Sequence, residues 1–298
     1  MNRIFRAAAI VFCLVGIIPV QAAETVLLTA TASTVARYEK FIEEKGGDPL
    51  SVIDFRSYWS QRGVVDIVLI QQALHLGGME AEIEFLIVPN PARGQVEVKN
   101  GSAVLYAHDI WPDSFDDSVH MSAPVLRPGE FEVLVFTLPG RSDVLAAESL
   151  ADLRAFRPVI VQSWEKDRQV LESLGFTDIE EASRYELIFK MLRAGRGDFT
   201  LLSASGLQQA ESSGDGMVLV PLRGMKIQFP YSRHFMVSRT HPMGDPVFRA
   251  LEEGLGILHD RGIVTRAMTE CGFISETIRD WTILNHDRTV PEKISGNP

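Results

Sequence analysis

The segment PVIVQSWEKDRQVLESLGFTDIEEASRYELIFKMLRAGRGDFTLL, residues 158–202, decides the fold class because strand-like and helix-like runs alternate along it. Residues 158–161 and 199–202 are short and apolar, which indicates buried strands. Residues 164–174 and 184–194 have the length and spacing of helices, and each run ends directly before a glycine, where helices commonly stop. This alternation is typical of α/β proteins, in which helices return the chain for parallel strands.

The same alternation extends in both directions from this segment. Short apolar runs that predict strands lie at residues 26–30, 83–88, 103–107, 131–138, 217–221 and 235–238. Helical patterns lie between them, and two closing helices are predicted at residues 247–259 and 263–270. We therefore predict an α/β fold for the whole chain after its N-terminal segment.

The first residues have the pattern of an export signal. Arg3 and Arg6 precede an apolar stretch over residues 7–20, which ends in the small-residue pattern Val20-Gln21-Ala22. The stretch is shorter than the roughly 20 apolar residues that a membrane-spanning helix needs. We therefore expect a signal peptide that is cleaved near Ala22 and a mature protein that is free in the periplasm.

The net charge limits the classes of binding partner, and the cysteine content limits how the fold can be stabilised. The chain carries a formal net charge of −10, and removal of Arg3 and Arg6 with the signal peptide brings this to about −12. Such a surface repels nucleic-acid phosphates and anionic lipids, so neither is expected as a partner. Cys271 is the single cysteine left after processing, so core burial rather than an internal disulfide must stabilise the fold.

A search for local catalytic and metal-binding motifs is negative. The chain has no Gly-x-Ser-x-Gly elbow, no phosphate loop that ends in Gly-Lys-Ser/Thr and no His-Glu-x-x-His pair. The seven histidines are scattered, and none is spaced to put two metal ligands on one helical face. We therefore expect no enzyme of these common kinds, no metal and no cofactor.

Five short motifs occur in an order that resembles a known family. They are Ser122-Ala123-Pro124, Ser149–Leu153, Leu192–Asp198, Leu258–Gly262 and Met268–Phe273. In this order and spacing the chain resembles bacterial extracellular solute-binding proteins of family 3, which have a type 2 periplasmic binding protein-like fold. The resemblance covers roughly residues 58–273 and is to a divergent branch.

The resemblance implies two α/β lobes that are joined by two crossing strands, with a ligand in the cleft between the lobes. The implied division is a signal peptide at 1–22, lobe 1 at 23–137 and 229–284, lobe 2 at 138–228 and a C-terminal tail at 285–298. A monomer is expected. Closing such a hinge on a small molecule stabilises the closed state, which a transporter or receptor can recognise.

The candidate ligand-binding residues differ from those of amino-acid binders in the family. Those proteins use an arginine shortly before Ser-x-Pro for the ligand carboxylate and an acid after Gly-Arg-x-Asp for the amine. Neither residue is present here, which argues against a standard α-amino acid. Aromatic and hydroxyl residues near the expected cleft, with two available cations, are the candidates instead: Arg93, Trp111, Ser163, Trp164, Ser203 and Arg233. Core packing of the two tryptophans is an equal alternative.

The sequence thus predicts a periplasmic solute-binding protein that serves a membrane permease and performs no chemistry. A ligand-sensing partner of a membrane receptor is one alternative, because transport and sensing use the same trap. A periplasmic dehydratase-like enzyme on the same fold is the other, with Asp167 and Glu186 as its candidate acid and base. Paired acids on helices are more often solvated surface residues.

Overall fold

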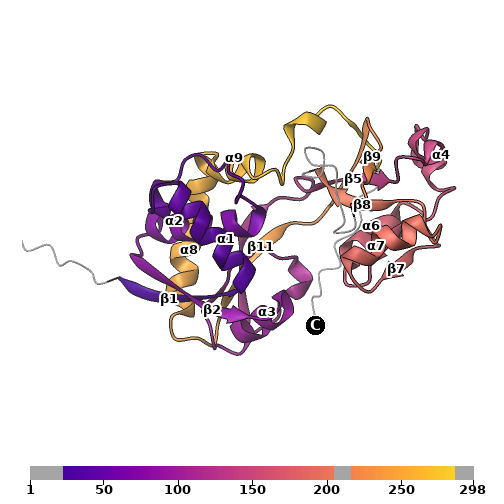
Figure 1. The fold of residues 1–298 in the computed structure, drawn as a ribbon. Helices are drawn as coiled ribbons and strands as arrows, with labels where there is room; N and C mark the ends of the chain where they lie inside the picture. Colours follow the sequence, from indigo (N-terminus) through magenta and orange to yellow (C-terminus); the bar gives the residue numbers. More distant parts are fainter. Residues whose placement is uncertain (1–22, 205–215, 286–298) are drawn as a thin grey trace, which may run out of the picture.

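The computed structural model describes residues 23–204 and 216–285, and these form two lobes (Figure 1). Lobe 1 contains the first sheet with its helices, and lobe 2 contains a second sheet, a two-stranded sheet and four helices. The expected signal peptide and nearly all of the expected C-terminal tail lie outside the described residues. Among those residues, no helix combines the length and the apolar character that crossing a bilayer requires.

The sheet of lobe 1 has the strand order β2-β1-β3-β11-β4. Its strands are β1 (Glu24–Thr31), β2 (Ala81–Val88), β3 (Leu105–Tyr106), β4 (Val119–Leu126) and β11 (Arg233–Ser238). β1 pairs in parallel with β2 and β3, whereas β11 runs antiparallel to β3 and β4. The carboxyl ends of β1 and β3 and the start of β11 therefore meet at one edge of the sheet.

Helices cover both faces of this sheet. They are α1 (Ala32–Glu44), α2 (Arg62–Leu76), α3 (Pro91–Lys99), α8 (Gly244–Asp260) and α9 (Ile263–Glu270), with the short 3-10 turns η1 (Pro49–Ser51) and η2 (Pro112–Ser114). The second half of α8 packs so closely on α2 that a Cβ atom at Gly254 would overlap the carbonyl oxygen of Ala73. Glycine is therefore needed at this helix crossing.

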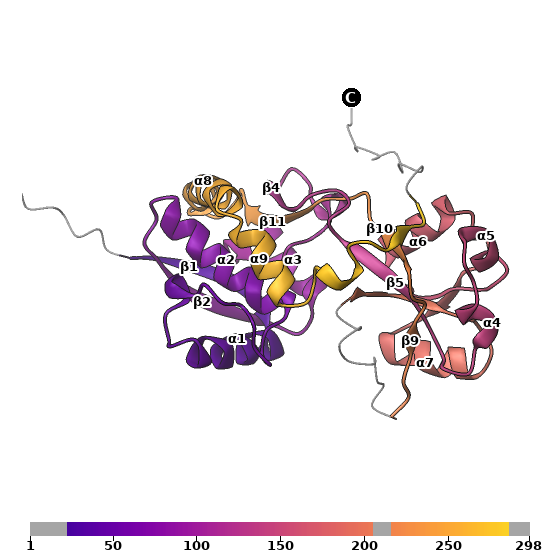
Figure 2. The same ribbon diagram turned by 90° about the horizontal axis from the view of Figure 1, so that it is seen from above.

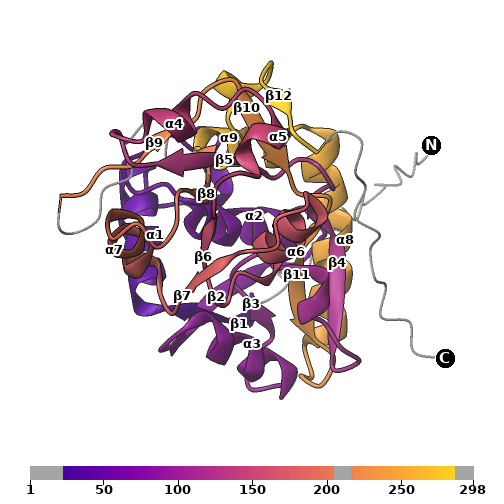
Figure 3. The ribbon, with the colours of Figure 1, turned by 90° about the vertical axis from the view of Figure 1, so that its right-hand side faces the viewer.

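Lobe 2 contains the sheet β12-β10-β5-β8 and the separate parallel pair β6-β7. The strands are β5 (Glu132–Thr137), β6 (Val159–Val161), β7 (Glu180–Ala182), β8 (Thr200–Ser203), β9 (Val220–Pro221), β10 (Met225–Gln228) and β12 (Thr282–Ile283). The helices are α4 (Ser142–Leu145), α5 (Leu150–Leu153), α6 (Glu165–Ser173) and α7 (Tyr185–Arg193), and the 3-10 turn η4 (Glu276–Ile278) precedes β12. Figure 3 views the molecule from the side of lobe 2 and shows α4 and α5 toward the end where β12 runs.

Three segments of the described chain join the lobes. One runs from β4 to β5 and another from β10 to β11, and these are the two crossing segments that the resemblance implied. The third runs from α9 through η4 to β12, which pairs with β10 (Figure 2). The C-terminal part of the described chain therefore returns to lobe 2.

Strand pairing differs from the sequence-based division at two places, because that division put residues 132–137 and 282–283 in lobe 1. β5 lies between β8 and β10, and its side chains enter both apolar cores of lobe 2. Val133 and Val135 pack in one core, and Leu134 and Phe136 pack in the other. Both faces of β5 are thus buried among residues of lobe 2, which is why β5 belongs there.

Candidate functional site

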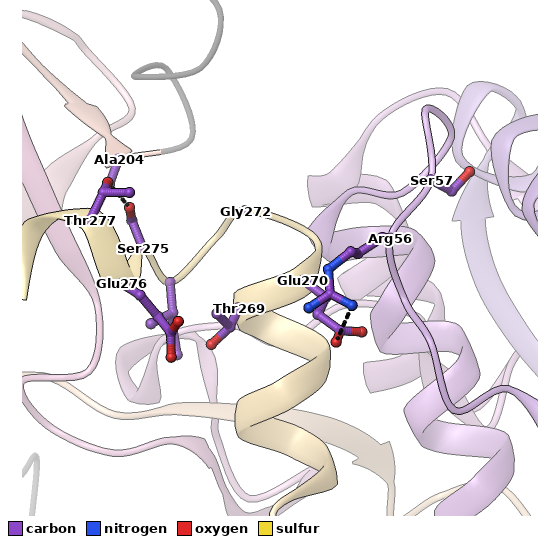
Figure 4. Close-up of a pocket in the computed structure, with 10 residues that line it drawn as sticks. Arg56, Ser57, Ala204, Thr269, Glu270, Gly272, Ser275, Glu276 and Thr277 are labelled. Atoms are coloured by element: carbon purple, nitrogen blue, oxygen red, sulfur yellow. Dashed lines mark hydrogen bonds and ion pairs between the residues drawn. The ribbon is translucent and has the colours of Figure 1, made fainter.

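A pocket of about 410 Å³ opens between the two lobes (Figure 4). Lobe 1 contributes the loop before α2 and the end of α9, and the other wall is the end of β8 with the segment that leads into β12. The lining residues are Arg56, Ser57, Ala204, Thr269, Glu270, Gly272, Ile274, Ser275, Glu276 and Thr277. A volume of this size holds a small organic molecule.

An ion pair lies at the lobe 1 wall of the pocket. The Arg56 guanidinium is 2.9 Å from the Glu270 carboxylate, and Figure 4 shows the two side chains reaching toward each other. The Glu270 side chain is 8% exposed and also accepts a hydrogen bond from the backbone N–H of Phe55 at 2.8 Å. The Arg56 side chain is 72% exposed. Glu270 is therefore held by two partners, and the largely exposed Arg56 also lies 3.4 Å from the Asp54 carboxylate.

The rest of the pocket wall is rich in hydroxyl groups. Ser57 and Thr269 lie on the lobe 1 side, and Ser275 and Thr277 lie on the segment that leads to β12. Ser275 and Thr277 hydrogen-bond to each other at 2.8 Å. Such a wall offers donors and acceptors to a polar solute rather than an apolar surface.

Beside the pocket, a cluster of charged residues lies at the carboxyl edge of the lobe 1 sheet. We call it the arginine–aspartate cluster; it consists of Arg62, Asp66, His108, Asp109 and Arg233. Asp109 follows β3 and is fully buried. The Arg233 Nε donates to one Asp109 carboxylate oxygen at 3.0 Å, and Arg62 forms an ion pair with the other oxygen. Both guanidinium groups also donate to the backbone carbonyl of Asp109, at 2.8 Å from Arg233 and 3.2 Å from Arg62.

The electrostatics of the cluster follow from this burial. Burial alone would raise the pKa of Asp109, but the charges of Arg233 and Arg62 outweigh it and hold the pKa of Asp109 below its usual value. Burial, followed by the charge of Asp109, raises the pKa of Asp66 to about 6. Burial and the charge of Arg62 lower the pKa of Arg233 to about 10. Asp109 is therefore the ionised centre of the cluster.

Asp66 is the less well satisfied carboxyl of the cluster. One of its oxygens accepts a hydrogen bond from the backbone N–H of Asp109 at 3.3 Å and lies 3.7 Å from the His108 ring nitrogen. Its other oxygen, Oδ1, has no hydrogen-bond partner among the described residues. The missing partner makes the ionised form of Asp66 less favourable than it is in water, in agreement with its raised pKa.

Aromatic rings pack where the connecting segments cross. The Trp111 ring is stacked against Phe229 with centroids 5.8 Å apart, and the Arg233 guanidinium lies 4.1 Å from the Trp111 centroid. Phe131 stacks on Phe273 at 4.9 Å, and the Arg62 guanidinium lies 5.0 Å from the Phe273 centroid. Arg62 of the arginine–aspartate cluster thus contacts Phe273, whose chain neighbours Gly272 and Ile274 line the pocket.

Helix α6 of lobe 2 contacts lobe 1 through its first turn. The Lys166 ammonium is 2.9 Å from the Asp113 carboxylate in η2 and lies 4.2 Å from the centroid of the Tyr231 ring. The Tyr231 hydroxyl donates to Gln169 at 3.0 Å. These contacts hold the start of α6 against lobe 1 and against the segment that leads into β11.

The next residue of α6, Asp167, is a half-buried acid. Burial raises its pKa to about 7, while the charge of Arg233 in lobe 1 acts to lower it. In the part of the chain that the structure describes, its carboxylate forms no ion pair. A group of this kind can take up or release a proton near neutral pH.

The structure brings two of the candidate residues together in lobe 1. Arg233 belongs to the arginine–aspartate cluster, and the Trp111 ring packs against both the Arg233 guanidinium and the Phe229 ring. Trp111 thus has the packing role that was its alternative interpretation, and its role as a ligand contact stays a prediction. Arg93 lies on α3, exposed and paired with Glu97 on the same helix.

The other three candidate residues lie in lobe 2. Ser163 is exposed directly before α6, and Trp164 is the N-cap residue of that helix, with its ring 6.2 Å from Tyr185. Ser203 ends β8, next to Ala204 in the pocket wall. Their contact with a ligand also stays a prediction.

Sequence reasoning missed Arg56, Arg62, Asp66, Asp109 and Glu270. One of these carried a usable signal, because His108 and Asp109 directly follow the apolar run 103–107. A charged residue at the carboxyl end of a buried strand lies where α/β folds place their ligands. The sequence offers no comparable signal for the other four residues.

No family model matches the chain, and no curated protein matches it either. Solved structures do. The probable amino-acid ABC transporter extracellular-binding protein of Bacillus subtilis is 14% identical, with a TM-score of 0.57 over 83% of this chain and 96% of that protein. An amino acid ABC transporter substrate-binding protein from Streptococcus pneumoniae, bound to L-arginine, is 12% identical, with a TM-score of 0.51 over 84% and 95% of the two chains.

A third similar structure is an ancestral amino acid-binding protein described as a precursor of cyclohexadienyl dehydratase. It is 14% identical, with a TM-score of 0.50 over 82% of this chain and 93% of that protein. At such identities the similarity concerns the fold. It confirms the predicted α/β fold of the type II periplasmic binding proteins, with two lobes and mixed sheets.

Proposed function

We propose that this chain, which has the fold of bacterial solute-binding proteins, is itself an exported solute-binding protein that captures a small polar molecule between its lobes. Three of the similar proteins are binding proteins for amino acids, and two of them are named as parts of ABC transporters. Delivery to a membrane permease is therefore the proposed role, and the protein performs no chemistry on its ligand.

The observation that carries this proposal is the pocket of about 410 Å³, whose walls come from both sides of the hinge. A solute in it would contact Arg56 and Glu270 on lobe 1 and the hydroxyl-bearing segment at Ser275 and Thr277. A ligand that touches both walls binds the closed arrangement better than an open one, and this difference drives closure. The closed form is then what a permease distinguishes from the empty protein.

The proposed contacts extend to two hydroxyls that sequence reasoning selected. Ser203 adjoins Ala204 in the pocket wall, and Ser163 precedes the helix whose first turn meets lobe 1. Both are in lobe 2, so contact with them would add to the preference for the closed state.

The test combines ligand screening with a block of the pocket. We expect one chemical class from a panel of amines, amino acids, sugars, organic acids and nucleosides to raise the melting temperature in a saturable way, since a ligand that binds only the native state stabilises it. Thr277→Trp should abolish the shift because the indole fills the pocket. Thr177→Trp, at an exposed loop of lobe 2, is the matched control and should keep it.

Solution scattering supplies the second readout of this test. The same ligand should reduce the radius of gyration of the wild type and not that of Thr277→Trp. A folded protein with no response across the panel would refute the proposal. Binding that survives Thr277→Trp at full strength would place the solute elsewhere.

A dehydratase-like enzyme is the second candidate function, and Asp167 is the observation that favours it. A half-buried carboxyl with a pKa of about 7, here on the first turn of α6, has the properties of a general acid or base. One of the similar structures is described as a precursor of a dehydratase. Nuclear magnetic resonance of the bound ligand distinguishes the two functions: an unchanged ligand supports binding, and loss of water from it supports the enzyme.

A further inference from the structure

The charged side chains that line the interlobe pocket are Arg56, Glu270 and Glu276, and each has a partner of opposite charge within the protein. The Arg56 guanidinium is 2.9 Å from Glu270 and 3.4 Å from Asp54. On the segment that leads into β12, Glu276 is 3.2 Å from Arg279. A ligand carboxylate would have to compete with Glu270 for Arg56, and a ligand ammonium would have to compete with Arg56 for Glu270. The pocket therefore favours a solute without charge.

The Arg56–Glu270 pair still has hydrogen-bonding capacity for a ligand. The guanidinium is largely exposed and carries more N–H donors than its two carboxylate partners use. One Glu270 oxygen lies beside Arg56, the other accepts from the backbone N–H of Phe55, and each oxygen can accept a further hydrogen bond. This wall thus presents a donor and an acceptor side by side. Two neighbouring hydroxyl groups fit such a pair, because one can accept from Arg56 while the other donates to Glu270.

The facing wall presents a second pair of this kind. The hydroxyl groups of Ser275 and Thr277 are 2.8 Å apart, and Figure 4 shows them on the opposite side of the pocket from Arg56 and Glu270. Each hydroxyl can both donate and accept, so this pair also fits neighbouring hydroxyls of a ligand. Among the described residues that line the pocket none is aromatic, so the wall has no ring on which the apolar face of a cyclic sugar could stack. An open-chain molecule can instead turn hydroxyl groups to both walls.

We propose that the pocket binds an uncharged open-chain polyol, with the Arg56–Glu270 pair and the Ser275–Thr277 pair each binding two of its neighbouring hydroxyls. This inference rests on the proposed function, since it names the class of solute for the same site. The polyol bridges the two walls without breaking either pair of side chains. A carboxylate or an ammonium group on the same carbon chain lowers the affinity, because it meets a like charge within the Arg56–Glu270 pair.

The test uses compounds that share one carbon chain and differ in charge or in ring closure. Sorbitol is uncharged, gluconate ends in a carboxylate, glucamine ends in an ammonium group, and glucose is the cyclic counterpart. Mannitol and xylitol are compared with their corresponding acids, amines and sugars in the same way. Calorimetry with the purified protein at pH 7.5 measures each affinity. We expect at least one polyol to bind at least tenfold more tightly than its three counterparts, and equal or tighter binding of a counterpart in every set overturns the inference.

Two variants test the Arg56–Glu270 pair by unbalancing its charge in opposite directions. Arg56→Gln leaves Glu270 without its cation, so it should weaken polyol binding and raise the affinity for glucamine relative to gluconate at least tenfold. Glu270→Gln leaves the positive charge in excess and should shift the same ratio at least tenfold toward gluconate. Arg249→Gln, which removes an exposed arginine of α8 outside the pocket wall, is the matched control and should change each affinity less than twofold.

Melting curves show which variants are folded. Because the Arg56 side chain is 72% exposed, Arg56→Gln tests the pair even if replacement of the buried Glu270 prevents folding. An unchanged ratio of the glucamine and gluconate affinities in Arg56→Gln overturns the assignment of the pair as the binding element.

The outcomes separate this inference from the proposed function. A cyclic sugar, an organic acid, an amine or an amino acid as the tightest ligand overturns the polyol class and leaves the solute-binding function intact. The absence of any ligand, with the polyols added to the thermal-shift panel, overturns both.

Discussion

Removal of the Asp109 carboxylate should show how much the arginine–aspartate cluster contributes to the free energy of unfolding. Asp109→Ala leaves two buried or half-buried guanidinium groups without their counter-ion. Breaking a buried ion pair by removing one partner costs about 3–5 kcal/mol. The Arg62 side chain is 29% exposed and recovers part of its hydration, whereas that of Arg233 is 8% exposed and recovers little. We therefore expect the free energy of unfolding to fall by about 3 kcal/mol.

The same variant should bind a small carboxylate where its own was removed. Acetate added at ten times its dissociation constant stabilises the native state by about 1.4 kcal/mol, by mass action. The wild type, whose guanidiniums are occupied, should gain nothing. Sodium chloride at equal ionic strength controls for screening and should not restore stability.

The assay is equilibrium unfolding in urea at pH 7, with and without acetate. Asp113→Ala is the matched control, because it also removes one carboxylate from an ion pair, but from one whose acid is 46% exposed. Such a pair contributes at most about 1 kcal/mol. A loss below 1 kcal/mol in Asp109→Ala, or equal recovery in acetate and chloride, would refute the assignment of Asp109 as the buried counter-ion of both arginines.

Three further predictions concern acid–base balance, interlobe contact and packing. Between about pH 4 and 7 the folded protein keeps a proton on Asp167 that the unfolded chain has lost, so this group lowers stability as pH rises. Asp167→Asn should therefore stabilise the protein at pH 8, by up to about 4 kcal/mol, and much less at pH 4 in urea unfolding. Lys166→Ala should raise the radius of gyration in solution scattering, while the free energy of unfolding falls by less than about 1 kcal/mol. Gly254→Ala should cost about 1–3 kcal/mol in thermal or urea unfolding, because the new methyl group overlaps Ala73, whereas Gly256→Ala on the exposed side of α8 should be neutral or slightly stabilising.

The alternation of strands and helices could be predicted because it depends on local patterns. The glycines after α6 and α7, Gly175 and Gly195, have φ values of +90° and +67°, the left-handed backbone that ends helices there. The apolar runs that predicted β1 and β8 lie in the cores of their lobes. Local composition and the glycines that end helices were therefore sufficient to predict most of the helices and strands.

The membership of β5 and the composition of the site could not be predicted in the same way. β5 reads as a long apolar strand in either lobe, and only its pairing with β8 and β10 decides. Arg233 and Asp109 are 124 residues apart in the chain, and a single sequence carries no sign that they meet. Trp111 could bind a ligand or pack in the interior, and its contacts with Arg233 and Phe229 depend on the fold.

The third segment between the lobes has a mechanical consequence. The two crossing segments, from β4 to β5 and from β10 to β11, would by themselves allow the lobes to bend and also to twist relative to each other. The return of the chain through Glu276–Ile278 to Thr282–Ile283 adds an anchor beside them and removes much of that rotational freedom. The third segment therefore restricts the relative motion of the lobes mainly to bending. A nick in this segment should leave both lobes folded and let them swivel.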